Sequence, residues 1–147
     1  QRNLHIRNTL FTMVDEGVVP IINENDSVSV EEIKIGDNDT LAAAAASLWN
    51  ADVLIMLSDI DGVFDKDPKE NKDAGLIEEI YDLDSLLENI DAKGKSDFGT
   101  GGIVTKIEAA KRARKYYIPT VLMNGRKRSI IIDAAEGKAK GTTFLCP

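Results

Sequence analysis

Two clusters of carboxylate and amide side chains lie at the ends of segments that are predicted to be buried. Residues 23–26 (Asn-Glu-Asn-Asp) end an apolar run, and residues 37–39 (Asp-Asn-Asp) open an alanine-rich stretch that favours a helix. A helix start uses one capping side chain, and a second acid can offset the helix dipole. Because the two clusters hold more polar groups than capping requires, they predict a site for an ammonium group or a metal ion.

A glycine-rich segment suggests a phosphate site. Residues 99–106 (Gly-Thr-Gly-Gly-Ile-Val-Thr-Lys) place three glycines before a predicted helix and Lys106 in its first turns. Free backbone N–H groups and the positive helix end favour a phosphate there, and a lysine can neutralise a phosphoryl group in transfer. The spacing differs from the P-loop, in which lysine directly follows the last glycine. A glycine-rich loop with a solvated lysine is the alternative that this segment leaves open.

An acidic loop follows the clearest predicted strand. Its four carboxylates, which could suggest a calcium loop, are Asp59, Asp61, Asp65 and Asp67. The EF-hand spacing fails, because the sixth position counted from Asp59 is Phe64 where glycine is required. We therefore interpret the loop as acidic turns. Ser58 and Asp59 end the strand, where a nucleotide's sugar or base would be hydrogen-bonded.

The elements that must position these residues alternate between helix and strand. Helical spacing predicts helices at residues 4–14 (with Gly17 as a stop), 38–50, 83–90, 103–117 and 130–136. Apolar runs predict strands at residues 18–22, 52–57, 76–80, 119–123 and 142–145, the second of them covered on both faces. Residues 28–35 alternate loosely, as in an exposed strand or arm. Such alternation predicts an α/β fold with a mostly parallel sheet flanked by helices. Ligands of these sheets bind beyond the carboxyl ends of the strands, where residues 23–26 and 58–61 fall.

Composition limits the classes of function. A chain of 147 residues with 43% hydrophobic content is the size of one domain with a real core. The net charge of −7 argues against a role on nucleic acid or on a membrane surface. The apolar runs are too short to cross a bilayer, and no signal peptide pattern is present. Cys146 is the single cysteine, so we expect no disulfide and a reducing cytoplasm. We interpret His5 and Trp49 as packing residues. The basic stretches at 111–115 and 126–128 are interpreted as solvated.

Taken together, these segments resemble the amino acid kinase family. The resemblance rests on PIINEND (20–26), IKIGDNDTLAA (33–43), LIMLSDIDGVFDKDP (54–68), FGTGGIVTK (98–106) and GTTFL (141–145). The order and spacing of these blocks match the family through nearly all of the chain. The pairing of INEND with GDND favours glutamate as the phosphate acceptor over acetylglutamate, aspartate, carbamate or uridylate. The resemblance implies a three-layer α/β/α sandwich, of which residues 1–147 would form the C-terminal, nucleotide-binding part.

The resemblance also implies an activity. It is the ATP-dependent phosphorylation of the glutamate side-chain carboxylate to glutamyl 5-phosphate, the first step of proline biosynthesis, with Mg²⁺ bridging the ATP phosphates. Lys106 and Asp39 would be catalytic, Lys106 at the transferring phosphoryl group and Asp39 as the organiser of lysines. Asp26 and Asn38 would bind glutamate, with Asp37 close by. The residues implied to bind the nucleotide are Ser58, Asp59, Thr100, Gly101, Gly102, Ile103, Val104, Thr105 and Lys106.

The sequence departs from the family pattern at its N-terminal side. The family's first strand, its glycine turn, a second catalytic lysine and a serine that contacts glutamate are not among residues 1–147, and neither is the PUA domain that many members carry. We therefore expect an incomplete catalytic domain that is inactive or very weakly active alone. The alternative is a non-catalytic amino-acid-sensing module, against which the presence of Lys106 and Asp39 argues. The family further implies a homo-oligomer, and we expect proline as a feedback inhibitor acting near residues 24–32.

Overall fold

The computed structural model of the chain describes residues 2–23, 38–93 and 102–147. The helices are α1 (Arg2–Asp15), α2 (Asn38–Trp49), α3 (Leu83–Lys93), α4 (Gly102–Arg114) and α5 (Ile130–Ala135). The strands are β1 (Leu54–Ser58), β2 (Glu79–Ile80), β3 (Thr120–Asn124) and β4 (Thr142–Phe144). All of the helices predicted from the sequence are confirmed, and so are the strands predicted at 52–57, 119–123 and 142–145. Of the strand predicted at 76–80, only Glu79–Ile80 forms a strand.

The strands form one sheet in the order β1-β3-β4-β2. β1 pairs with β3 in parallel, so that Ser58 lies opposite Asn124 at the carboxyl ends of the two strands. β2 also pairs with β4 in parallel, whereas β3 and β4 are antiparallel. The expectation of an α/β fold with a mostly parallel sheet is therefore confirmed, with one antiparallel pair in it.

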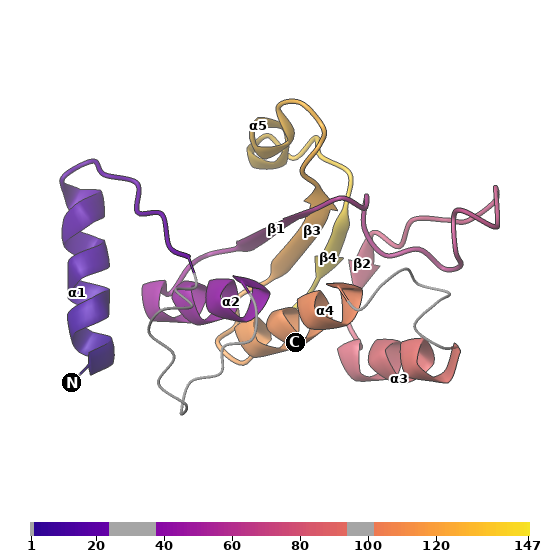
Figure 1. The fold of residues 1–147 in the computed structure, drawn as a ribbon, viewed down its shortest axis with the longest axis horizontal. Helices are drawn as coiled ribbons and strands as arrows, with labels where there is room; N and C mark the ends of the chain where they lie inside the picture. The colour runs from indigo at the N-terminus through magenta and orange to yellow at the C-terminus, as the bar shows by residue number, and fades with distance from the viewer. Residues whose placement is uncertain (1, 24–37, 94–101) are drawn as a thin grey trace.

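Helices α2 and α4 pack against each other beneath one face of the sheet (Figure 1). Small side chains line this contact, since Ala43 on α2 and Ala109, Ala110 and Ala113 on α4 are almost fully buried. Alanine favours a helix and lets two helix backbones approach closely. Both helices run back under the strands, which places their N-terminal turns at the end of the sheet where β1 ends (Figure 1).

The other face of β1 differs from the sequence prediction. Val53, Ile55 and Leu57 are 42%, 37% and 44% exposed, so the strand is covered on one face only by the described residues. The strand predicted at residues 18–22 was also wrong: this stretch is irregular, and Ile21 is 96% exposed. An apolar run becomes a strand only with a hydrogen-bonded neighbour, and the described residues provide none for it. The exposed strand or arm predicted at residues 28–35 lies outside the described residues.

The connection from β1 to β2 is a long loop whose two arms are tied together. Phe64 and Leu76 form an isolated antiparallel bridge across it. Val63 and Ile77 are joined by a backbone hydrogen bond of 2.8 Å, donated by the Ile77 N–H. The loop therefore returns to the sheet in a fixed arrangement. Within the described part of the chain, no helix is long and apolar enough to span a membrane.

Candidate active site

The first turns of α2 and α4 bring a carboxylate and an ammonium group together. The Lys106 Nζ lies 3.0 Å from the Asp39 Oδ2, and the Thr105 hydroxyl donates to the same oxygen at 2.8 Å. The Asp39 and Lys106 side chains are only 22% and 16% exposed. Because such a pair is shielded from water, its attraction exceeds that of an ion pair on the surface.

Local sequence explains why these groups meet. Asp39 stands in the first turn of α2, where a carboxylate is favoured by the helix dipole. On α4, Ile103 and Ile107 are buried in the core, and this fixes the rotation of the helix so that Lys106 points toward α2. Ile103 was predicted to bind nucleotide, and with its side chain in the core only its backbone could face a ligand.

The arrangement suits a phosphate. α4 begins at Gly102, and the N–H groups of a first helical turn have no partner within the helix. An ammonium group carries three donors, and the structure shows Lys106 using a bond to Asp39. Its remaining donors and the positive end of α4 can both be directed at an anionic oxygen. The carboxylate of Asp39 holds the lysine at this place.

A second polar group lies at the carboxyl end of β1. The Ser58 hydroxyl contacts the Asp59 carboxylate at 3.3 Å, and the Ser58 carbonyl accepts a hydrogen bond of 2.8 Å from the Gly125 N–H. Asp59 is exposed. Among the described residues, no hydrogen bond or ion pair joins this group to Asp39 and Lys106. The two groups thus form separate parts of the site at the same end of the sheet.

An ion pair that the sequence analysis missed supports this second group. The Asp61 Oδ1 accepts a hydrogen bond from the Lys127 Nζ at 2.8 Å and from the Asn124 side-chain amide at 3.0 Å. The Lys127 ammonium and the Asn124 amide together hold the pKa of the Asp61 carboxyl below its usual value. The contact joins the loops that follow β1 and β3. The signal available in the sequence was that polar residues follow both of these strands directly.

The same loop is also held from the side of β4. The Thr142 hydroxyl accepts a hydrogen bond of 2.8 Å from the Val63 N–H and donates one of 2.7 Å to the Ile77 carbonyl. A Cβ atom on Gly62 would lie 2.5 Å from the Thr142 hydroxyl, and Gly62 has a φ of +151°, so both space and backbone favour glycine there. Residues 58–63 are therefore fixed on both sides.

The remaining predicted residues divide into two sets. Asn38 is the exposed first residue of α2, and Val104 is partly buried on α4. Asp26, Asp37, Thr100 and Gly101 lie outside the described residues. The carboxylates of the acidic loop make separate contacts: Asp65 accepts from the Gly75 N–H and Asp67 from the Lys69 N–H. Among the described residues, these carboxylates therefore contact different partners and do not converge on one centre.

Comparison with known proteins relates this chain to one family. The model of the amino acid kinase family matches residues 1–124. A protein of Alkaliphilus metalliredigens named glutamate 5-kinase is 61% identical over 143 residues, which are 97% of this chain and 54% of that protein. A protein of the same name from Alkaliphilus oremlandii is 59% identical over 98% of this chain and 55% of its own length. The chain thus spans about half the length of these relatives.

Solved structures share the fold. The UMP kinase of Ureaplasma parvum superposes with a TM-score of 0.67 at 23% identity and covers 95% of this chain, which corresponds to 52% of that protein. An isopentenyl phosphate kinase of T. acidophilum superposes with a TM-score of 0.59 at 27% identity, over 93% of this chain and 52% of its own.

Proposed function

This chain belongs to the amino acid kinase family, and from this premise we propose that the protein transfers the γ-phosphoryl group of ATP to the side-chain carboxylate of glutamate. The observation that carries the proposal is the ion pair of Lys106 and Asp39, which is shielded from water, has a length of 3.0 Å, and lies at the start of α4, where the helix begins with Gly102. The high identity to two proteins named glutamate 5-kinase supports glutamate as the acceptor. Residues 1–147 would form the C-terminal, nucleotide-binding part of the kinase domain.

Phosphoryl transfer to a carboxylate requires positioning and charge neutralisation more than acid–base chemistry. An ionised carboxylate is already nucleophilic, so no general base is needed. In the proposed site, the start of α4 and the segment from Thr100 to Lys106 would hold the phosphates, with Lys106 at the transferring group. Asp39 would keep Lys106 in place, and Thr105 supports Asp39 through its hydrogen bond. Lys106 and the start of α4 would neutralise the charge that develops during transfer, whereas Asp39 and Thr105 would act by holding Lys106 in place.

The other predicted residues receive roles in the same proposal. Ser58 and Asp59 would contact the nucleoside portion of ATP, because they lie at the carboxyl end of β1. Asn38, at the start of α2, would bind glutamate together with Asp26 and Asp37. Proline, as a feedback inhibitor, would act next to this glutamate site, and normal proline inhibition after substitution of residues 24–32 would contradict that part.

Magnesium is expected with the nucleotide. Mg²⁺ favours one or two carboxylates together with substrate phosphates over a cage made of protein side chains alone. Within the described residues, no group of three or more His, Cys, Asp or Glu side chains is arranged to hold a metal ion. We expect the ion to be held mainly by the phosphates, where it would neutralise charge during transfer.

The test is a calorimetric titration of magnesium–ADP into the full-length protein and three variants. We expect Lys106→Ala and Asp59→Asn each to weaken binding by about tenfold, the value of one charge-assisted contact. Asp52→Asn is the control, because Asp52 is an exposed acid at the opposite end of β1. Absence of binding by the wild-type protein would overturn the kinase assignment and favour a module that only senses an amino acid. Equal affinity in all variants would overturn the site.

A further inference from the structure

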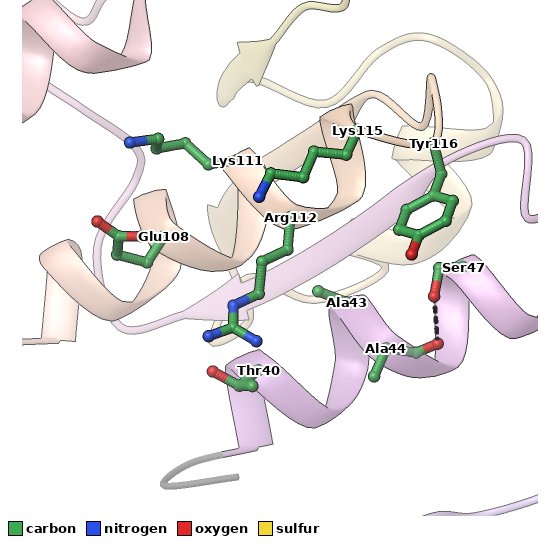
Figure 2. Close-up of a pocket in the computed structure, with 9 residues that line it drawn as sticks. All are labelled: Thr40, Ala43, Ala44, Ser47, Glu108, Lys111, Arg112, Lys115 and Tyr116. Atoms are coloured by element: carbon green, nitrogen blue, oxygen red, sulfur yellow. Dashed lines mark hydrogen bonds between the residues drawn. The ribbon is translucent and has the colours of Figure 1, made fainter.

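We propose that the groove between α2 and α4 is a binding site for a compact anion with at least two negative charges, such as a small phosphate or polycarboxylate. The groove has a volume of about 510 Å³ and opens on the side of the helices away from the sheet (Figure 2). Its lining residues are Thr40, Ala43, Ala44, Ser47, Glu108, Lys111, Arg112, Lys115 and Tyr116. The proposal concerns binding alone and does not depend on the proposed function.

The cations of α4 fall into two groups. Lys106 is paired with Asp39, Lys111 with Asp84 at 2.6 Å, and the Arg114 guanidinium donates to the Tyr81 carbonyl. The side chains of Arg112 and of Lys115, which directly follows the end of α4, have no hydrogen bond or ion pair among the described residues. Both of these unpaired cations line the groove.

Their spacing directs them to one side of the helix. Residues three or four positions apart lie on the same helical face, which places Glu108, Arg112 and Lys115 in one row. Among the described residues that line the groove, Glu108 is the only one with a carboxylate, and in Figure 2 its side chain is directed away from α2. The part of the groove next to α2 is therefore positively charged, in a protein whose net charge is −7.

The opposite wall, formed by α2, leaves room for a ligand, and its described residues offer no counter-charge to it. Asp39 is the only charged residue of α2, and its carboxylate is taken by Lys106. Between Thr40 and Ser47, the wall consists of the small side chains of Ala43 and Ala44. Figure 2 shows Arg112 extending from α4 toward Thr40 and Tyr116 extending toward Ser47, with the two alanines between them. Longer side chains here would close the space that the groove provides.

The donors define the class of ligand. A guanidinium group can bind two oxygens of one carboxylate or phosphate in a bidentate manner, and a lysine adds a point charge. The hydroxyl group and ring of Tyr116 can contact a polar or a flat ligand body at the other end. Cations near the end of α4 also offset the helix dipole. Offsetting the dipole requires neither an open groove nor small side chains on α2. Filling the groove therefore separates this role from ligand binding, because it would abolish only ligand binding.

The test uses inorganic pyrophosphate and citrate as separate probes, titrated calorimetrically into the full-length protein at constant ionic strength and without nucleotide. The first variant, Arg112→Gln with Lys115→Gln, removes both charges. The second, Ala44→Leu, fills the groove from α2 and leaves the charge unchanged. The control, Arg128→Gln with Lys138→Gln, removes the same two charges at exposed positions outside the groove.

We expect at least one probe to bind, and each groove variant to weaken this binding by about tenfold or more. The control should retain the wild-type affinity, and the groove variants should cause the same loss when Lys106 is also replaced by Gln, because Lys106 does not line the groove. A preference for pyrophosphate or for citrate would identify the ligand as a phosphate or a carboxylate. The proposal is overturned if neither probe binds, if both groove variants bind like the wild type, or if the control loses affinity equally. Loss in Lys106→Gln alone would place the anion in the candidate active site instead.

Discussion

Replacement of Thr142 by valine tests how the loop that follows β1 is held. The side chain is fully buried, and its hydroxyl group bonds to the Val63 N–H at 2.8 Å and to the Ile77 carbonyl at 2.7 Å. Valine has nearly the same shape as threonine, so the substitution creates no large cavity. It removes both hydrogen bonds and leaves a buried backbone donor without a partner.

The expected loss of stability follows from these two bonds. A buried donor left without a partner costs about 1–3 kcal/mol, and the second hydrogen bond contributes about 1 kcal/mol. Thr142→Val should therefore lower the free energy of unfolding by about 2–4 kcal/mol. For a protein of this size or somewhat larger, this corresponds to a fall in Tm of roughly 5–12 °C.

Urea unfolding of the full-length protein measures the effect against two controls. Thr142→Ser retains the hydroxyl group and should keep most of the stability. Thr143→Val changes the neighbouring, partly exposed threonine, whose side chain has no hydrogen bond among the described residues, and should have little effect. In hydrogen exchange, the Val63 amide should lose protection only in Thr142→Val. The reasoning is refuted if Thr142→Val is as stable as Thr143→Val, or if Thr142→Ser loses as much as the valine variant.

Two further substitutions test the loops around the candidate site. Asp61→Asn should lower the free energy of unfolding by about 0.5–1 kcal/mol at pH 7, the value of a partly exposed ion pair. Because Lys127 depresses the pKa of Asp61, this contribution is present above about pH 4 and is lost as pH falls through the lowered pKa. If the difference in unfolding free energy between Asp61→Asn and the wild type is the same at about pH 2.5 as at pH 7, this explanation is contradicted. Gly141→Ala would place a Cβ against the Leu122 carbonyl oxygen of β3. We therefore expect the free energy of unfolding, measured by urea, to fall by about 1–3 kcal/mol. An unchanged urea midpoint would contradict this, because it would mean that the backbone can move away from the new methyl group.

Much of the fold could be predicted from the sequence because each helix has a local pattern. Ile103, Ile107 and Ala110 recur at helical spacing and are buried together on α4. The strand predicted at residues 18–22 failed for the opposite reason. Its apolar residues form a suitable run, but a strand also requires a neighbour, and strand pairing is not a property of the run itself. Ile21 is therefore exposed in the described structure.

The candidate site was predictable in part. The sequence blocks identified Asp39 and Lys106, and the structure supplies their contact, which depends on the close packing of α2 on α4 through alanines. The pair of Asp61 and Lys127 was missed because both residues lie in loops that contain several charges. No periodic pattern in such a loop shows which charge meets which; here the parallel register of β1 and β3 decides it.

The most direct test of the central claim is glutamate-dependent ADP release by the full-length protein, measured for the wild type, Lys106→Gln and Lys66→Gln. Lys66 forms an ion pair with Asp73 in an exposed loop and serves as the control for loss of one charge. We predict that kcat falls about 100-fold or more in Lys106→Gln, as when a donor to transition-state charge is removed, and that Lys66→Gln is unaffected. A Lys106→Gln protein that turns over within a few-fold of the wild type, or a wild type whose ADP release does not depend on glutamate, would contradict the account.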